Sequence, residues 1–374
     1  MCGDGACSVR RGKPRRHTGR ASAIISAIPM RLRRRLPILL GVLLVAAAVA
    51  LVVFLRKHAP PESARLLPGA DGFAYINLKW IRRVNVTGQL PSVSHDPEYE
   101  QFIQATGFQF ERDLDQAALA IHYPSSLPPQ TQAAQSPRYS EVFVGKIDGV
   151  RLRAYLHKLA SAVENDGSVE IYDIPLENRI LRVAILGPDT VAASNHPDAA
   201  VIRSIVERSR KLASPFGGPA LLRQYYKQIP LASLAWGIFK VNPPSGGSPA
   251  SLSDLSLLFS APAVVVASAR YLPSSLHLRA EAFTESPDEA KHVTEQLSTF
   301  LALFHAAETS VGSPGPDPDV KQFFSSLKVE QHGVRAVLTA ILPPGFIRKA
   351  VAEPPNEMEA PPPIGNPPSN PARK

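Results

Sequence analysis

Cysteine is almost absent from this sequence. Of its 374 residues, only Cys2 and Cys7 are cysteines, and both lie within the first ten positions. The rest of the chain therefore cannot hold an internal disulfide, a thiolate zinc site or a cysteine nucleophile. A chain of this length can be stable without such cross-links, because it is long enough to bury a large core.

Net charge is absent from most of the chain, although the total is +9. Residues 1–35 contain ten of the 41 basic residues and one of the 32 acidic residues, Asp4, which leaves 31 of each sign in the remainder. A neutral region lacks the concentrated positive field that phosphate binding requires. The charge distribution therefore excludes nucleic acid as a partner of the main part of the chain.

Motifs for metal, nucleotide or nucleophile chemistry are missing as well. The ten histidines include no HExxH pair, and the glycines and serines form no GxxxxGK[ST], GxGxxG or GxSxG motif. His196, His292, His305 and His332 are scattered, and we interpret them as structural or solvated side chains. The sequence therefore predicts no catalytic, cofactor-binding or metal-binding residues, and no cofactor.

Two weaker patterns leave alternatives open. Asp113 and Asp115 lie in ERDLDQ and would support acid–base chemistry if the fold brought their carboxylates together, but alternation before a strand would place both in solvent. Six aromatic residues could line a binding groove, although such residues more often fill the core. They are Trp80, Trp236, Tyr225, Tyr226, Phe323 and Phe324.

Long apolar runs are also missing, with one exception. Residues 36–55, from Leu36 to Leu55, carry no charge and match the ~20 residues that a membrane-spanning helix needs. Four arginines at 31 and 33–35 precede the run, so the basic excess predicts a cytoplasmic N-terminus and an exported C-terminal part. The alternative is a cleaved signal peptide, but its apolar region of ~7–15 residues would end before residues 51–55.

Residues 1–35 are read as a basic cytoplasmic tail. Met30 begins MRLRRRLPILL, which is a complete signal-anchor start by itself. We therefore expect translation to begin at Met30, with a genuine disordered tail as the alternative. This arrangement places the protein in the inner (cytoplasmic) membrane, with the lipid bilayer as a partner through residues 36–55 and the C-terminal domain in the periplasm or outside.

The exported part is predicted to be α+β, with antiparallel sheets packed by amphipathic helices. Its expected segments are a linker at 56–67, a first half at 68–213, a second half at 214–352 and a disordered Pro-rich tail at 353–374. Alternating apolar residues predict strands at 73–78, 117–123, 141–147, 169–174, 180–186, 190–194, 231–241, 263–272, 276–284 and a hairpin over 327–342. Because residues 141–194 and 276–342 both show a strand, a long helix and a hairpin, we predict two related halves.

Helices are predicted from their start signals and their apolar stripes. Four starts combine proline with an acidic residue, at Pro97, Pro197, Pro287 and Pro318. Asp148 begins another helix with a stripe of Leu152, Tyr155, Leu156, Leu159 and Val163. The helix over 287–307 is expected to open with a capping box of Ser286 and Glu289 and to bury Val293, Leu297, Phe300, Leu301 and Phe304.

Several stretches together resemble a known group of proteins. They are LLPGADGFAYINL, RDLDQAALAIHYP, EVFVGKIDGVRLRAYL, LRVAILGPDTVAAS and LKVEQHGVRAVLTAIL. The pattern, over about 66–342, resembles a loose group of uncharacterised bacterial single-pass envelope proteins with one N-terminal anchor and an exported α+β domain. The resemblance implies an architecture and carries over no functional residues.

The sequence thus favours a membrane-anchored domain with a non-catalytic binding or assembly role in the cell envelope, with an envelope protein as its partner. The alternative is an envelope hydrolase whose residues converge only in three dimensions. A further alternative makes the Pro-rich tail the working part, as a ligand for a groove-type module.

The orientation of the chain can be tested directly. A reporter enzyme fused after residue 352 should be active when it requires export, because the basic residues hold the N-terminus in the cytoplasm. Paired fusions to an export-dependent and a cytoplasm-dependent reporter measure this. Activity of the cytoplasmic reporter alone would reverse the assignment.

Overall fold

The computed structural model describes residues 43–47, 49–50, 59–84, 95–123, 137–177, 179–211, 217–242, 258–272, 275–310 and 318–346. Within the predicted anchor, residues 43–47 and 49–50 are helical with exposed side chains, and the rest of 36–55 lies outside the described residues. The predicted tails at 1–35 and 353–374 lie outside them too. Among the described residues, no helix is both long enough and apolar enough to cross a membrane.

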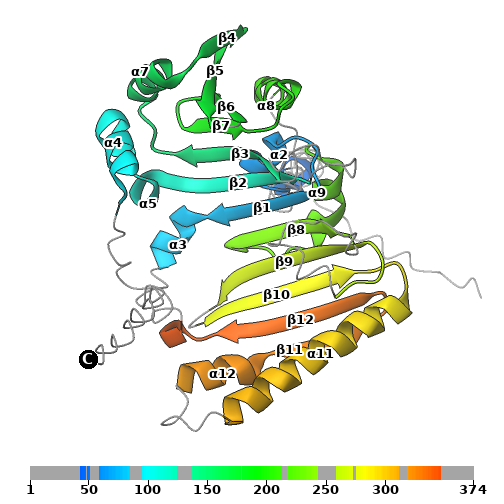
Figure 1. Ribbon diagram of the computed structural model, residues 1–374. Helices are drawn as coiled ribbons and strands as arrows, with labels where there is room; N and C mark the ends of the chain where they lie inside the picture. The colour runs from blue at the N-terminus through cyan, green and yellow to red at the C-terminus, as the bar shows by residue number, and fades with distance from the viewer. Residues whose placement is uncertain are drawn as a thin grey trace, which may run out of the picture. The chain divides into compact units, whose positions relative to one another are not determined.

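A single antiparallel sheet of twelve strands dominates the described part of the chain, which confirms the α+β prediction (Figure 1). Its strand order is β11-β12-β10-β9-β8-β1-β2-β3-β7-β6-β5-β4. The strands are β1 Gly72–Asn77, β2 Leu114–His122, β3 Arg138–Gly145, β4 Ala162–Asp166, β5 Val169–Leu176, β6 Arg179–Ile185, β7 Thr190–Ser194, β8 Ala235–Val241, β9 Ala263–Leu272, β10 Ser275–Phe283, β11 Lys328–His332 and β12 Arg335–Leu342. The predicted strands agree within a few residues, and β4 was missed.

The pair β1–β8 joins two wings of the sheet whose strands follow a similar order. From β1 the chain passes to β2 and β3, continues through a helix and the strands β4, β5 and β6, and returns in β7 beside β3. From β8 it passes to β9 and β10, continues through two helices and the single strand β11, and returns in β12 beside β10. The strands of the predicted halves 68–213 and 214–352 thus form the two wings, and both belong to one continuous sheet.

Helices cover both faces of the sheet. They are α2 Glu62–Leu66, α3 Leu78–Val84, α4 Pro97–Thr106, α5 Phe110–Asp113, α7 Gly149–Leu159, α8 Ala200–Arg210, α9 Ala220–Tyr225, the 3-10 turn η1 Tyr226–Gln228, α11 Pro287–Ser310 and α12 Pro318–Ser326. The predicted helix start at Pro97 is confirmed for α4, where Asp96 accepts a hydrogen bond from the Tyr99 N–H at 2.7 Å and Gly107 ends the helix at φ 72°.

One predicted helix start was wrong, and one predicted capping box formed only in part. Helix α8 begins at Ala200 instead of Pro197, and Asp198, which precedes the N-cap residue Ala199, accepts a hydrogen bond from the Ala200 N–H. At α11, Ser286 caps the Glu289 N–H as expected, but the Glu289 carboxylate accepts hydrogen bonds from Ser260 and Ala261. The second half of the predicted capping box therefore connects α11 to a neighbouring loop.

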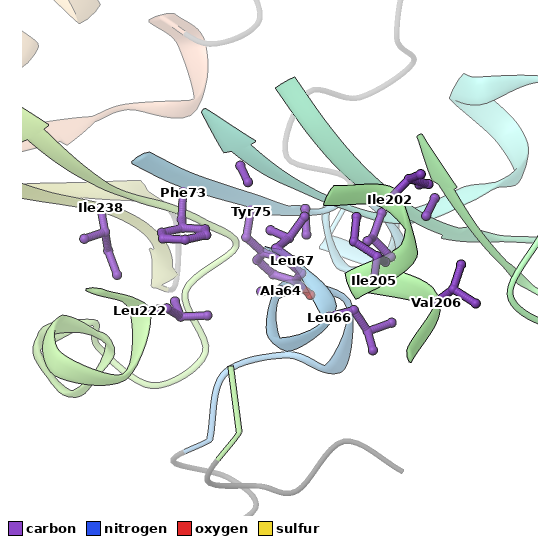
Figure 2. Packing of buried hydrophobic residues seen from close by; sticks show 14 of the residues in the cluster. Ala64, Leu66, Leu67, Phe73, Tyr75, Ile202, Ile205, Val206, Leu222 and Ile238 are labelled. Carbon is purple, nitrogen blue, oxygen red and sulfur yellow. The ribbon is translucent and has the colours of Figure 1, made fainter. Parts of the chain in front are cut away.

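The largest core lies on the face of the sheet that α2, α8 and α9 cover. Ala64, Leu66 and Leu67 lie among the side chains of β1, α8 and α9 (Figure 2), and Leu67 is 0% exposed. Arg208 of α8 donates hydrogen bonds to the Leu66 and Leu67 carbonyls at the end of α2. The prediction of a linker over 56–67 was therefore wrong for its second part, which is a buried helix.

The opposite face carries two smaller clusters. Leu152 and Leu156 of α7 pack on β5, β6 and β7, while Val293 of α11 packs on β8, β9, β10 and β12. The apolar stripes predicted for α7 and α11 included residues that are not buried. Leu159 of α7 and Phe300 of α11 are exposed, and Val163 belongs to β4, where it is also exposed. The side chain of Phe304 lies outside the described part.

The buried position of α2 predicts a large mutational effect. In a fragment of residues 59–352, Leu67→Ala should lower the free energy of unfolding by about 2–5 kcal/mol, because it removes a fully buried side chain and leaves a cavity. Urea denaturation measures the change. The control is Leu176→Ala, at a residue that is 47% exposed, which should change stability by no more than about 0.5 kcal/mol. Equal losses in the two variants would contradict the central position of α2.

Candidate functional site

A hollow of about 400 Å³ opens where β1 ends and β8 begins, on the face that α2 covers. This volume falls within the range of small-molecule sites. Its floor and walls come from four parts of the chain, which are the residue before α2, strand β1, the segment from η1 to β8, and β8 itself. The lining residues are Pro61, Tyr75, Asn77, Tyr226, Lys227, Ile229, Pro230, Leu231, Ala232, Ser233 and Trp236. We call this site the aromatic hollow.

Strand register creates the floor of the aromatic hollow. Tyr75 and Trp236 are direct partners in the antiparallel β1–β8 pair, so both side chains point to the same face. Their rings stack with centroids 5.4 Å apart and an interplanar angle of 21°. Tyr226 approaches Trp236 edge-on, with centroids 5.4 Å apart at 73°. The three rings therefore form a continuous aromatic surface, in arrangements that aromatic pairs favour.

The loop between η1 and β8 forms one side of the hollow. Ser233 bonds the Pro230 carbonyl through both its N–H and its hydroxyl, and the Leu234 carbonyl accepts from the Asn77 N–H at 2.7 Å. Ala232 lies in the left-handed region at φ 62°, which costs a non-glycine residue conformational energy. Leu231 nevertheless remains 51% exposed at the rim. Backbone and side-chain hydrogen bonds thus hold this loop, while the side chain of Leu231 remains exposed to solvent.

The two phenols of the hollow are unsuited to proton transfer near neutral pH. Burial, and then the charge of a nearby Tyr226 phenolate, raises the pKa of Tyr75 well above its ordinary value. Burial also raises the pKa of Tyr226 to about 12. Of the described residues that line the hollow, Lys227 alone carries a full charge, and its side chain is exposed. The site can bind through rings, apolar contacts and one cation.

The aromatic residues of the sequence analysis separate into different places. Trp236 and Tyr226 line the hollow, whereas Tyr225 packs edge-on against Phe283. Trp80 lies on α3, and Phe323 and Phe324 contact each other on α12. Sequence reasoning missed Tyr75, although its strand was predicted and alternation alone assigns it to the face of Phe73.

Asp113 and Asp115, for which the sequence left a carboxylate pair as one alternative, have different partners. Asp113 is buried and accepts hydrogen bonds from Arg112 and the Gln109 N–H, so the Arg112 guanidinium lowers the pKa of Asp113. Asp115 forms salt bridges with Arg82 and Lys79 instead. The expectation that both point into solvent was therefore wrong for Asp113, and both carboxylates are engaged with cations.

The histidines also form no catalytic or metal centre in the described part. Within that part, no three metal-ligating side chains come together. His196 meets the ring of His122, with centroids 5.1 Å apart, and His122 lies 3.1 Å from the buried Ser140 hydroxyl. Burial, followed by the charge of His196, lowers the pKa of His122.

The other three predicted histidines lie elsewhere. His332 contacts Glu330 and His292 contacts Gln296, while His305 belongs to α11 and its side chain lies outside the described part. The interpretation of His196, His292 and His332 as structural or solvated side chains stays a prediction.

One carboxylate outside the hollow has a raised pKa. Burial raises the pKa of Glu141 on β3. In the sheet its direct neighbours are Leu119 of β2 and Ala193 of β7. Val142, the next residue, packs in the α2 core, so Glu141 points to the opposite face. Glu141 therefore lies away from the aromatic hollow.

The tyrosines of the hollow predict a pH effect on stability. A raised phenol pKa means that stability is complete below the unfolded value of about 10 and is lost as pH rises toward 12. Tyr226→Phe should flatten this alkaline loss and reduce the late phase of an absorbance titration at high pH. Tyr155→Phe on α7 is the control. An unchanged late phase in Tyr226→Phe would show that Tyr226 ionises as an exposed phenol.

Comparison with known proteins gives limited information. No family model and no curated protein matches the chain. Solved structures titled crystal forms IV and III of TP0453 resemble it with TM-scores of 0.40 and 0.39 at 9% identity. They cover 79% and 78% of this chain and 98% of their own. A likeness of this size assigns neither a family nor a function.

Proposed function

We propose that this chain is a single-pass membrane protein whose exported α+β domain binds a ligand or partner in the cell envelope without catalysing a reaction. The anchor is residues 36–55, whose length and flanking arginines support an orientation with the N-terminus in the cytoplasm. The aromatic hollow is the proposed binding site. The two wings are proposed to be related halves, because in each wing three consecutive strands lead outward from β1–β8 and the last strand of the wing returns beside the third.

The observation that carries the binding role is the chemistry of the hollow. Three contacting rings and the exposed Leu231 supply apolar area, and Lys227 supplies one cation. Sites for small molecules combine an apolar lining with a few polar groups that orient the ligand. Catalysis by proton transfer would also require a group that titrates near the working pH, and burial moves Tyr75 and Tyr226 away from it.

The hydrolase alternative has less support among the described residues. It requires a nucleophile and a base within hydrogen-bond reach of each other in a site open to substrate. His122 does contact Ser140, but Ser140 is fully buried and shares its hydroxyl with Ser194 at 2.9 Å. Glu141 has a raised pKa, yet Leu119 and Ala193 are its sheet neighbours. Neither arrangement provides an accessible pair.

Site-specific photocrosslinking tests the binding role. A photoreactive amino acid in place of Leu231, in the full chain within its own membrane, should form a light-dependent adduct of defined mass, because Leu231 is exposed at the rim of the hollow. Mass spectrometry of the purified protein measures it. The same amino acid in place of Leu176, which is similarly exposed at the end of β5, is the control. Equal labelling at both positions, or none at Leu231, would contradict a binding site here.

A further inference from the structure

One residue that lines the aromatic hollow is near the proposed anchor in the sequence. Pro61 lines the hollow, and five residues, 56–60, separate it from the last residue of the apolar run, Leu55. Because an extended chain advances at most ~3.6 Å per residue, Pro61 lies no more than roughly 22 Å from the end of the membrane helix. Pro60 is already buried in the domain. If residues 36–55 span a bilayer, the length of this segment sets an upper limit on the distance between Pro61 and the end of the span.

The hollow combines a floor of nearly buried rings with an exposed cation and an exposed leucine, residue types that the lipid–water interface favours. Tyrosine and tryptophan are enriched at this interface, where the rings lie among glycerol groups and their polar atoms face water. Leu231 and Lys227 are exposed beside Tyr226, and no carboxylate is among the described residues that line the hollow. Glu62, the first residue of α2, is the neighbouring acidic residue in sequence. Arg56 and Lys57 add positive charge on the membrane side of Pro61.

We propose that the aromatic hollow binds the headgroup end of an anionic phospholipid from the membrane that carries the anchor. In this arrangement Lys227 contacts the lipid phosphate, while Tyr226, Trp236 and Leu231 pack against the glycerol and the first acyl carbons. The volume of about 400 Å³ accommodates this part of a lipid, and the acyl chains remain in the bilayer. The inference rests on the proposed binding role and names its ligand.

Fluorescence of Trp236 provides the test. The chain has two tryptophans, so Trp80→Phe in the full chain in detergent leaves Trp236 as the single reporter. Titration with a short-chain phosphatidylglycerol should give a saturable change, because the lipid contacts the indole ring. Lys227→Glu should weaken this binding roughly tenfold, since each lysine near an anionic lipid surface contributes about 1 kcal/mol and the substitution reverses the charge.

The matched control is Lys158→Glu, at an exposed lysine on α7, which should bind as tightly as the parent. Glycerol 3-phosphate is the second arm and should give no saturable change, because it lacks the acyl groups. Binding of glycerol 3-phosphate with equal affinity would identify a soluble phosphate ligand and overturn the lipid assignment. No saturable change with phosphatidylglycerol, or equal binding by the two lysine variants, would also overturn it. If Leu231 crosslinks to a peptide and the phosphatidylglycerol titration gives no saturable change, the proposed binding role holds and the lipid is excluded as its ligand.

Discussion

The pairing of β1 with β8 is the contact on which the rest of the structure depends. Without it, the described strands would form two separate sheets, each with an unpaired edge at its inner strand. The pair also joins residues that are far apart in sequence, since Phe73 lies opposite Ile238 and Tyr75 opposite Trp236. Both of these side-chain pairs belong to the α2 core. One register thus determines the continuity of the sheet, the centre of its core and the floor of the aromatic hollow.

The two outer edge strands of the sheet, β4 and β11, carry charged side chains. Edge strand β4 is exposed and carries Glu164 and Asp166, which pair with Arg203 and Arg210 of α8. At the other edge, β11 carries Lys328 and Glu330 and has four exposed residues of five. Charges on edge strands discourage pairing with another chain. The apolar contacts of the fold are therefore concentrated in the middle, where β1, β8 and α2 meet.

Local patterns in the sequence predict the position of most strands, but they do not predict which strands pair with each other in the sheet. Apolar patterns in the sequence located β9, β10 and the β11–β12 hairpin, because β9, β10 and β12 are rich in apolar residues. They missed β4, since Ala162–Asp166 is polar and exposed and has no buried face to detect. They also missed α2, because a helix of five residues is too short to show a helical period and two prolines precede it. The neighbouring sequence could not have revealed α2, because this helix is stabilised by residues of β1, α8 and α9, which are distant in the chain.

The aromatic hollow was beyond sequence reasoning for the same reason. Tyr75, Tyr226 and Trp236 belong to three segments, and only the β1–β8 register brings Tyr75 against Trp236. Aromatic residues at such spacings usually fill a core, and these rings do so in part, since Tyr75 and Trp236 are almost fully buried.

The hollow exists because the loop from Ile229 to Leu234 stops short of covering the two rings completely. That loop keeps Ala232 in a left-handed conformation and Leu231 in solvent, and both features cost free energy in an isolated domain. A ligand that covers Leu231 and the ring edges would recover part of this cost. The strained residue and the exposed leucine are thus the two features of this loop that the proposed binding role would use.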